Sequence, residues 1–110
     1  MKKEYFDQVI VKAGEDMLCD MKLTYYLLTG AISEEYCDLE VYGVEIEKEL
    51  VSGRNSEGIE RKLIKDLFFK KSEAVEFLNK ISCNKVTPME LKYVLRDYIY
   101  DQINSATVNN

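Results

Sequence analysis

The pattern of hydrophobic residues changes about two thirds of the way along the chain, from alternation to helical spacing. Two sets of residues alternate in the middle of the sequence: the apolar Tyr42, Val44 and Ile46, and the acidic Glu45, Glu47 and Glu49. Successive side chains of a strand point to opposite faces of the sheet. This segment therefore predicts a β-strand with one buried face and one acidic face.

Three other segments also predict strands, at about residues 5–11, 25–28 and 59–69. Residues 25–28 are apolar throughout, which is typical of a strand that is covered on both faces or paired centrally. Turn-forming residues at 13–16 and 52–58 separate these segments. Leu39 and Val41 have the parity opposite to Tyr42, and Gly43 follows them, so we expect a β-bulge near Gly43 that switches the faces of the strand.

The clearest local signal is a helix start at Thr87. Thr87 can cap the helix, Pro88 suits the first helical position, and Glu90 can reach back to complete a capping box. Val86 and Leu91 occupy the two positions of a hydrophobic staple. The core-facing residues that follow have helical spacing: Leu91, Val94, Leu95, Tyr98 and Gln102. A polar tail is expected from residue 104 onward.

A shorter helix precedes this one. Ser72 can cap it, and its apolar residues have helical spacing: Ala74, Phe77, Leu78 and Ile81. Only residues 82–85 separate the two helices, and Asn84 is expected to end the first one in a left-handed conformation. Because the connection is short, we expect the helices to be neighbours in an αα-hairpin.

Strands followed by helices indicate the α+β class. We predict a three- to four-stranded antiparallel β-meander followed by a C-terminal αα-hairpin packed on one face of the sheet. Residues 1–103 are expected to form a single α+β domain, and 104–110 a polar C-terminal tail.

Composition and charge exclude several kinds of partner. The chain has 110 residues, 46% of them hydrophobic, with a net charge of −5. Acidity argues against direct nucleic-acid binding through phosphates and against attachment to an anionic membrane. No apolar run approaches the roughly 18 residues of a membrane-spanning helix, and Lys2 and Lys3 are followed by acids rather than by a signal peptide core. We therefore expect a cytoplasmic protein.

The residue types needed for common catalytic chemistry are missing or scattered. The chain has no histidine, so a histidine-based triad is unavailable. Five glycines lie far apart rather than in a phosphate-binding loop. Three widely spaced cysteines (Cys19, Cys37 and Cys83) are expected to be reduced, partly buried thiols rather than zinc ligands. We expect no enzyme, no cofactor and no metal site.

Three segments carry a resemblance to a known family. They are residues 23–28, residues 42–46, and residues 84–91 with Val94 and Asp97. Their pattern is similar to a family of small uncharacterised clostridial (Firmicutes) proteins, a domain of unknown function. The resemblance covers roughly residues 23–100 and implies an α+β domain. It brings no known activity, cofactor or site.

The negative charge is concentrated in one stretch. Residues 34–49 contain seven acids (Glu34, Glu35, Asp38, Glu40, Glu45, Glu47 and Glu49) and one base, Lys48. Their sum of −6, against −5 for the chain, leaves the other residues at +1. We expect Glu45, Glu47 and Glu49, with Glu40 and Asp38 nearby, to dock on a basic partner surface.

The simpler alternative for these acids is that they are solvated residues on the open face of the sheet. A basic run follows in the sequence: Arg61, Lys62, Lys65, Lys70 and Lys71. If the two strands pair, cross-strand ion pairs are expected, and these would partly neutralise the acidic row.

The tyrosines are the second candidate for binding. The chain has eight tyrosines and no tryptophan, and Tyr93 and Tyr100 lie two helical turns apart, away from Leu91 and Leu95. Such an exposed pair suits a homodimer or a contact with another protein. The alternative is that tyrosines fill the boundary of a small core.

These observations favour a non-enzymatic acidic protein-binding module, either an adaptor or an inhibitor. The expected partner is another protein with a basic surface. One alternative is a phage-type inhibitor of a host nuclease, an anti-CRISPR-like mimic of nucleic acid, whose binding would be salt-sensitive. Another is a small enzyme using carboxylates and tyrosine, which would need a deep pocket lined by perturbed acids.

Overall fold

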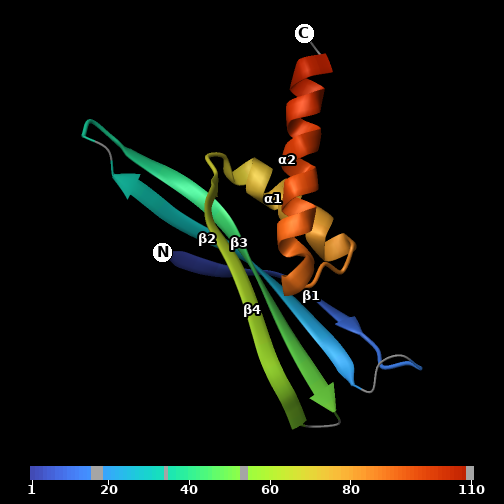
Figure 1. The fold of residues 1–110 in the computed structure, drawn as a ribbon. Helices are drawn as coiled ribbons and strands as arrows, with labels where there is room; N and C mark the ends of the chain where they lie inside the picture. The colour runs from blue at the N-terminus through green and yellow to red at the C-terminus, as the bar shows by residue number, and fades with distance from the viewer. Residues whose placement is uncertain (16–18, 34, 53–54, 109–110) are drawn as a thin grey trace.

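The protein is an α+β domain, as the sequence predicts. The computed structural model describes residues 1–15, 19–33, 35–52 and 55–108. Four antiparallel strands, β1 (Lys2–Val11), β2 (Asp20–Ser33), β3 (Asp38–Ser52) and β4 (Asn55–Phe68), form one sheet in the order β1-β2-β3-β4. Helix α1 (Lys71–Cys83), the 3₁₀ turn η1 (Pro88–Glu90) and helix α2 (Leu91–Val108) follow. Each strand pairs with the next in sequence, so the meander is confirmed (Figure 1).

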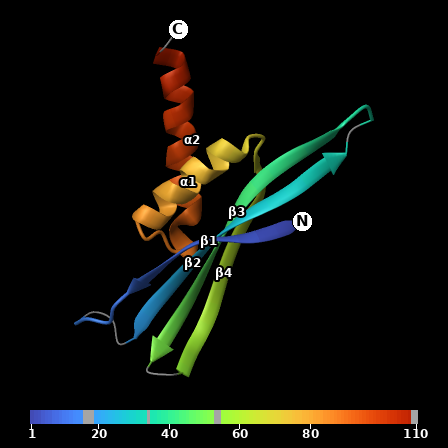
Figure 2. The ribbon, with the colours of Figure 1, turned by 180° about the vertical axis from the view of Figure 1, so that it is seen from behind.

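The helices cover one face of the sheet, which we call the inner face, and the outer face is left open (Figures 1 and 2). The inner face carries the buried side chains that the alternation predicts in β3, Tyr42, Val44 and Ile46. Leu23, Tyr25 and Leu27 of β2 lie beside them in the same core. Four residues of α1 are buried against this face: Ala74, Phe77, Leu78 and Ile81.

Three aromatic rings join β4 to the two helices. The ring centroids of Phe77 in α1 and Tyr98 in α2 lie 5.0 Å apart. Phe68, at the end of β4, lies 5.8 Å from Phe77 and 6.1 Å from Tyr98. These tilted and edge-on arrangements are the favourable ones for aromatic pairs. The cluster therefore fixes where the helices cross each other over the end of β4.

A buried hydrogen bond ties the sheet to the segment between the helices. The hydroxyl of Tyr25, in the centre of β2, donates to the carbonyl oxygen of Val86 at 2.8 Å. Tyr25 is fully buried, so both groups need this partner. Burial, with the negative charges of Asp7 and Glu90, raises the pKa of Tyr25 well above its ordinary value.

The helix start at Thr87 is confirmed, with a short 3₁₀ turn before α2. The Glu90 carboxylate accepts hydrogen bonds from the Thr87 N–H at 3.1 Å and from the Thr87 hydroxyl at 2.8 Å. Val86 and Leu91, the expected staple residues, are both buried. The expected polar tail is helical as far as Val108.

Two predictions about the ends of α1 are wrong. Lys70 rather than Ser72 occupies the N-cap position, so Ser72 already lies inside the helix. Asn84 is not left-handed, because its φ is −96°. Its side-chain amide donates to the carbonyl oxygen of Lys80 at 2.7 Å. Lys85 has the positive φ of 53° that turns the chain toward η1.

The expected bulge is present opposite Gly43, but the extra residues belong to β4. Tyr42 pairs with Phe68 and Val44 with Ile64, so four steps along β4 match two along β3. The Cβ of any side chain at position 43 would lie 2.1 Å from the Ile64 carbonyl oxygen. Glycine is therefore required there for β4 to approach. β3 itself pairs with β2 without interruption. The predicted switch of faces along β3 therefore does not occur.

One part of the sheet is only two strands wide. Pairing of β1 with β2 begins at Thr29, and pairing of β4 with β3 ends at Tyr42. Residues 30–33 and 38–41 therefore pair only with each other, and the described residues 35–37 lie at the tip. We call this segment the ribbon. It projects from the body at the same end as the second half of α2 (Figures 1 and 2).

These two projections make the molecule elongated. The radius of gyration is 16.3 Å, and the principal dimensions are 52 × 34 × 17 Å. A compact domain of this length has a radius of gyration of about 13 Å. Asp16 of the first predicted turn and Gly53 and Arg54 of the second lie outside the described residues, and β4 already begins at Asn55.

Candidate protein-binding site

The glutamates of β3 share one face, as the alternation predicts. Glu45, Glu47 and Glu49 lie on the outer face, opposite Tyr42, Val44 and Ile46. Glu45 is only 5% exposed, whereas Glu47 and Glu49 are half-buried. The expected geometry of this row is therefore present.

Each of the three carboxylates, however, forms an ion pair with a base on another strand of the sheet. Glu47 pairs with Arg61 of β4 at 2.9 Å. Glu49 pairs with Lys22 of β2 at 3.3 Å, and Glu45 pairs with Lys3 of β1. We call these six residues the ion-pair ladder. Because acids and bases alternate across the outer face, the row does not present an unneutralised acidic surface.

Glu45 has the most enclosed position in the ladder. Its Oε2 atom is buried and lacks a hydrogen bond of good geometry, so the charge of Lys3 is what compensates it. The Lys3 ammonium also lies 4.2 Å from the centre of the Tyr26 ring, which is a favourable cation–π distance. Lys3 therefore links the first strand to the third across β2.

Arg61 is the one base of the ladder that the sequence indicated. Its guanidinium donates to Glu47 Oε2 at 2.9 Å, and this hydrogen bond raises the pKa of Arg61. Lys3 and Lys22 were not identified, because a strand's neighbours in the sheet must be known before such partners can be assigned.

The other two acids of the candidate site are on the ribbon. Asp38 and Glu40 are both exposed, and Glu35 and Tyr36 are exposed at the tip. The Tyr42 hydroxyl donates to Glu40 at 2.8 Å, and this bond raises the pKa of Tyr42. Within the described part of the chain, none of the ribbon acids forms an ion pair. Glu34, the first acid of the segment, lies outside that part.

The tyrosine pair of α2 is exposed, as expected. Tyr93 is 49% exposed and Tyr100 is 65% exposed, while Tyr98 is buried in the aromatic cluster. Cations flank Tyr93, with Lys92 Nζ 5.0 Å and the Arg96 guanidinium 5.6 Å from its ring centre. The exposed side of α2 is therefore both aromatic and basic.

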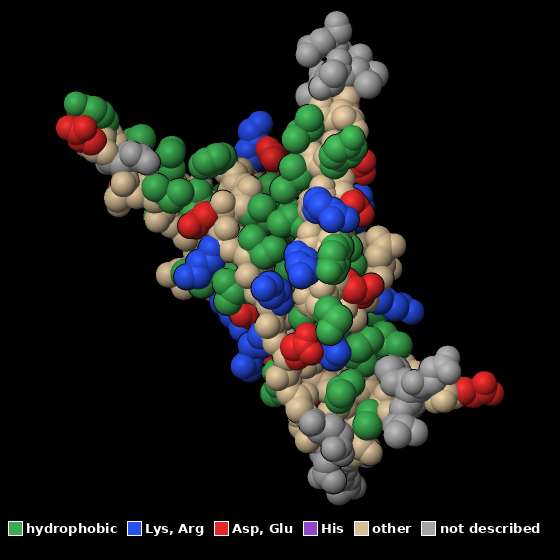
Figure 3. All heavy atoms as spheres, in the orientation of Figure 1, with side chains coloured by type: hydrophobic (Ala, Val, Ile, Leu, Met, Phe, Trp, Pro, Cys, Tyr) green, Lys and Arg blue, Asp and Glu red, His purple; other side chains and the backbone are tan. Residues whose placement is uncertain are grey.

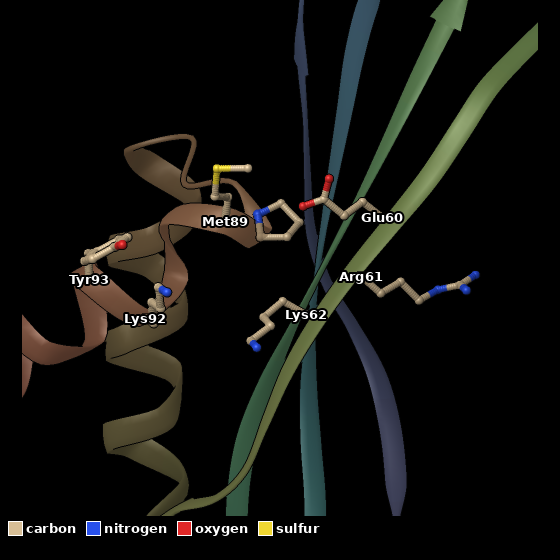
Figure 4. A pocket seen from close by; sticks show the side chains of 7 residues that line it. Glu60, Arg61, Lys62, Met89, Lys92 and Tyr93 are labelled. Carbon is tan, nitrogen blue, oxygen red and sulfur yellow. The ribbon is translucent and has the colours of Figure 1, made fainter.

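Two hollows that share Lys92 lie along this side of α2. The first, of about 420 Å³, lies between β4 and η1 and is lined by Glu60, Lys62, Met89, Lys92 and Tyr93 among others. The second, of about 400 Å³, is lined by Lys92, Leu95, Arg96, Ile99 and Tyr100 among others. Lys62 and Lys92 extend into the space between β4 and the helix, whereas Arg61 points away from it (Figure 4). We call this surface the α2 groove.

Most of the α2 groove is not evident from the sequence. Ile99 and Lys92 lie about a quarter turn from the core stripe, and their helical spacing with Arg96 was a usable signal. The contribution of Lys62 could not be foreseen, because it depends on how η1 packs against β4.

The cysteines and acids do not assemble a metal site in the described residues. No group of three or more cysteine, aspartate, glutamate or histidine side chains is placed to hold an ion there. Cys37 and Cys83 are exposed, which corrects the expectation of partly buried thiols, and only Cys19 is partly buried.

Neither described helix combines the length and the apolar composition that crossing a membrane requires.

The fold defines the chain as a small α+β protein in which a four-stranded meander is covered on one face by two helices. By sequence, the chain belongs to a family of unknown function (DUF6514), whose model matches residues 8–101. Comparison with curated proteins and with solved structures gives no match.

Proposed function

We propose that the protein is a non-enzymatic protein-binding module that docks its acidic ribbon on a basic surface of another protein. The observation that supports this most directly is the contrast between two groups of acids. Those of the central sheet are neutralised in the ion-pair ladder, whereas Asp38 and Glu40 of the ribbon are exposed and have no base nearby on the ribbon.

The ribbon also carries exposed apolar side chains among its acids. Tyr36 at the tip is 91% exposed, and Leu39 is 41% exposed. Hydrophobic side chains are visible along the ribbon in the space-filling view (Figure 3). An aromatic anchor surrounded by charges is the usual composition of an energetically important contact between proteins.

Electrostatics supplies the long-range part of such an interaction. Residues 30–41 contain four acids and no base, so the ribbon attracts a basic surface. Complementary charges of this kind accelerate association and fix orientation, and their effect falls as salt screens them. Binding through the ribbon should therefore weaken steeply with ionic strength.

The two alternative functions receive less support. A mimic of nucleic acid needs a row of unneutralised negative charges, and the ladder intersperses Lys3, Lys22 and Arg61 among the glutamates. An enzyme that uses carboxylates needs acids gathered in a pocket. The α2 groove is instead lined mainly by lysine, arginine and apolar residues.

The proposal can be tested by affinity capture from cells that contain the protein naturally. The variant Asp38→Lys/Glu40→Lys reverses the charge of the ribbon. We expect it to lose partners that the wild-type protein captures, and we expect those partners to elute at raised salt. The matched control is Glu76→Lys/Asp101→Lys, which makes the same charge change at exposed positions of the two helices.

The outcome depends on the difference between these variants. Loss with the ribbon variant and retention with the control would support docking through the ribbon. Recovery of the same partners in the same amounts by all three proteins would contradict it. Release of the partner by added DNA or RNA would indicate that the partner's basic surface is a nucleic-acid groove.

A further inference from the structure

The molecule exposes more surface than a monomer of its mass requires. Its accessible surface is 7594 Å² for a mass of 12.8 kDa. Folded monomers of this mass expose about 6,300 Å². The excess of about 1,300 Å² exceeds the roughly 800 Å² that each partner buries in a standard protein interface.

The ribbon accounts for part of this excess, and its stability as an isolated element is a problem. A two-stranded hairpin without further cover is marginally stable in water. Ile32 and Leu39 are paired across the ribbon, and Leu39 and Tyr36 remain exposed. A surface that covers Tyr36 and compensates Asp38 and Glu40 would stabilise the ribbon.

The α2 groove has the complementary properties. It offers Lys62, Lys92 and Arg96 as positive groups beside one acid, Glu60. Arg96 forms only a loose ion pair, with Asp97 at 3.9 Å. The apolar lining of the groove includes Met89 and Ile99, both exposed in the single chain. An acidic segment with an aromatic anchor fits this surface in charge and in hydrophobicity.

We infer that the occupant of the α2 groove is the ribbon of a second copy of this chain. Glu35, Asp38 and Glu40 of one copy then face Lys62, Lys92 and Arg96 of the other. Tyr36 covers the apolar lining of the groove, while Leu39, whose parity is opposite to that of Asp38 and Glu40, stays on the other face of the ribbon. The inference rests on the proposed function, because it names the basic surface on which the ribbon docks.

The placement of the two surfaces favours a reciprocal exchange. The ribbon and the second half of α2 project from the same end of the body and diverge from each other (Figures 1 and 2). Hydrophobic side chains lie along both projections (Figure 3). Two copies related by a twofold axis can place each ribbon on the other's α2, which closes the assembly at a dimer.

The test is a charge exchange between ribbon and groove, read by light scattering after size exclusion with a reductant present, because Cys37 is exposed. The wild-type chain should have twice its 12.8 kDa mass. The ribbon variant Asp38→Lys/Glu40→Lys and the groove variant Lys92→Glu/Arg96→Glu should each be monomeric. Like charges then face each other, which should weaken association by roughly a hundredfold or more.

Mixing the two variants is the decisive measurement. In a mixed dimer, the acidic ribbon of the groove variant meets the basic groove of the ribbon variant, and the reversed charges meet at the other contact. The equimolar mixture should therefore recover the dimer mass. This recovery also shows that both variants are folded. The control Glu76→Lys/Asp101→Lys makes the same charge change at exposed positions outside the groove, with Asp101 on the opposite side of α2 from Lys92, and it should remain dimeric.

Several results would overturn the inference. They are a monomeric wild-type chain at every concentration, an assembly larger than a dimer, dimers that survive in both single variants, and a mixture that stays monomeric. A monomeric wild-type chain would leave the proposed function intact if the ribbon variant still loses its captured partners. Unchanged capture by the ribbon variant would remove the proposed function as well.

Discussion

At the scale of single residues, Tyr25 connects the two halves of the fold. Its hydroxyl reaches Val86, which is 61 positions later in the chain, and both residues are buried. A polar atom in such a position must be paired, because an unpaired buried group is strongly unfavourable. The apolar pattern around Tyr25 predicts a central strand, but nothing in the sequence indicates this long-range partner.

We expect Tyr25→Phe to lower the free energy of unfolding by about 1–2 kcal/mol, because the Val86 carbonyl loses its donor. Urea denaturation followed by circular dichroism measures the change. Tyr36→Phe removes the same hydroxyl from an exposed tip residue and should change stability by less than about 0.5 kcal/mol. Equal effects of the two substitutions would show that the buried hydrogen bond contributes nothing.

Gly43 is the second residue on which the fold depends. We expect Gly43→Ala to destabilise the protein by at least about 2 kcal/mol, because its Cβ would lie 2.1 Å from the Ile64 carbonyl oxygen. Gly14→Ala is the matched control, since a Cβ there meets nothing within 4 Å. Thermal unfolding of both variants distinguishes a specific close approach from a general loss of glycine. A Gly43→Ala protein as stable as the control would be inconsistent with this packing of β4.

At the scale of elements, the start of α2 was the most predictable feature. Thr87, Pro88 and Glu90 mark the start of the helix within four residues. The hydrogen bonds between Thr87 and Glu90 form within the same turn. The ends of α1 were less predictable. Ser72 and Asn84 are good terminal residues by type, but burial of Phe77 and Ile81 fixes the phase of α1 and leaves these two in other roles.

Glu90→Ala should lower the free energy of unfolding by about 1 kcal/mol, because the Thr87 N–H and hydroxyl lose their acceptor. Glu76→Ala, at an exposed position of α1, changes the charge equally without removing a cap. Denaturant titration of both variants gives the comparison. If Glu76→Ala were equally destabilising, the effect would be one of charge rather than of capping.

Strand β4 shows what pattern alone could not provide. Ile64 and Phe68 both contribute to the core although they are separated by two extra residues of bulge. The alternation in this segment is broken for that reason. The extra residues of β4 fit opposite Gly43, because Gly43 has no side chain. The sequence indicates this position only once the pairing of β3 with β4 is known.

Strand β1 is held to the sheet by Lys3 as well as by backbone pairing. Lys3→Ala should lower stability by about 1–2 kcal/mol, because it leaves the enclosed Glu45 without a compensating charge, while the partial exposure of Lys3 limits the loss. Lys2→Ala removes the neighbouring base, whose pair with Glu4 is exposed, and should have an effect below about 0.5 kcal/mol. Comparable losses in these two variants would argue against a special role for Glu45.

At the scale of the whole molecule, alkaline pH should unfold the protein through its tyrosines. The pKa values of Tyr25, Tyr42 and Tyr98 are all raised in the folded state. Their contribution to stability is complete below the unfolded tyrosine pKa of 10.0 and is lost as pH rises above it, because the unfolded chain releases protons first.

Urea midpoints measured on either side of pH 10 should therefore fall steeply in the wild-type protein and less steeply in Tyr25→Phe. Tyr42 and Tyr98 account for the slope that remains. An identical pH dependence in the two proteins would mean that Tyr25 ionises equally well in the folded and unfolded states.

The sequence predicted the overall architecture well, because the meander and the helices follow from local patterns. It predicted the candidate site less well. The parity of Glu45, Glu47 and Glu49 was correct, but their partners Lys3 and Lys22 come from distant strands. The α2 groove likewise combines Lys62 of β4 with residues of η1 and α2, which only the tertiary structure brings together.

The sequential order of the strands has a consequence for synthesis on the ribosome. Each hairpin can close as soon as its second strand emerges, because no strand waits for a distant neighbour. The inner face of the sheet, however, has no cover until the helices and Val86 have been translated. A nascent chain halted after β4 would therefore expose an apolar surface and leave the Tyr25 hydroxyl without its hydrogen-bond acceptor. We expect such a chain to bind chaperones.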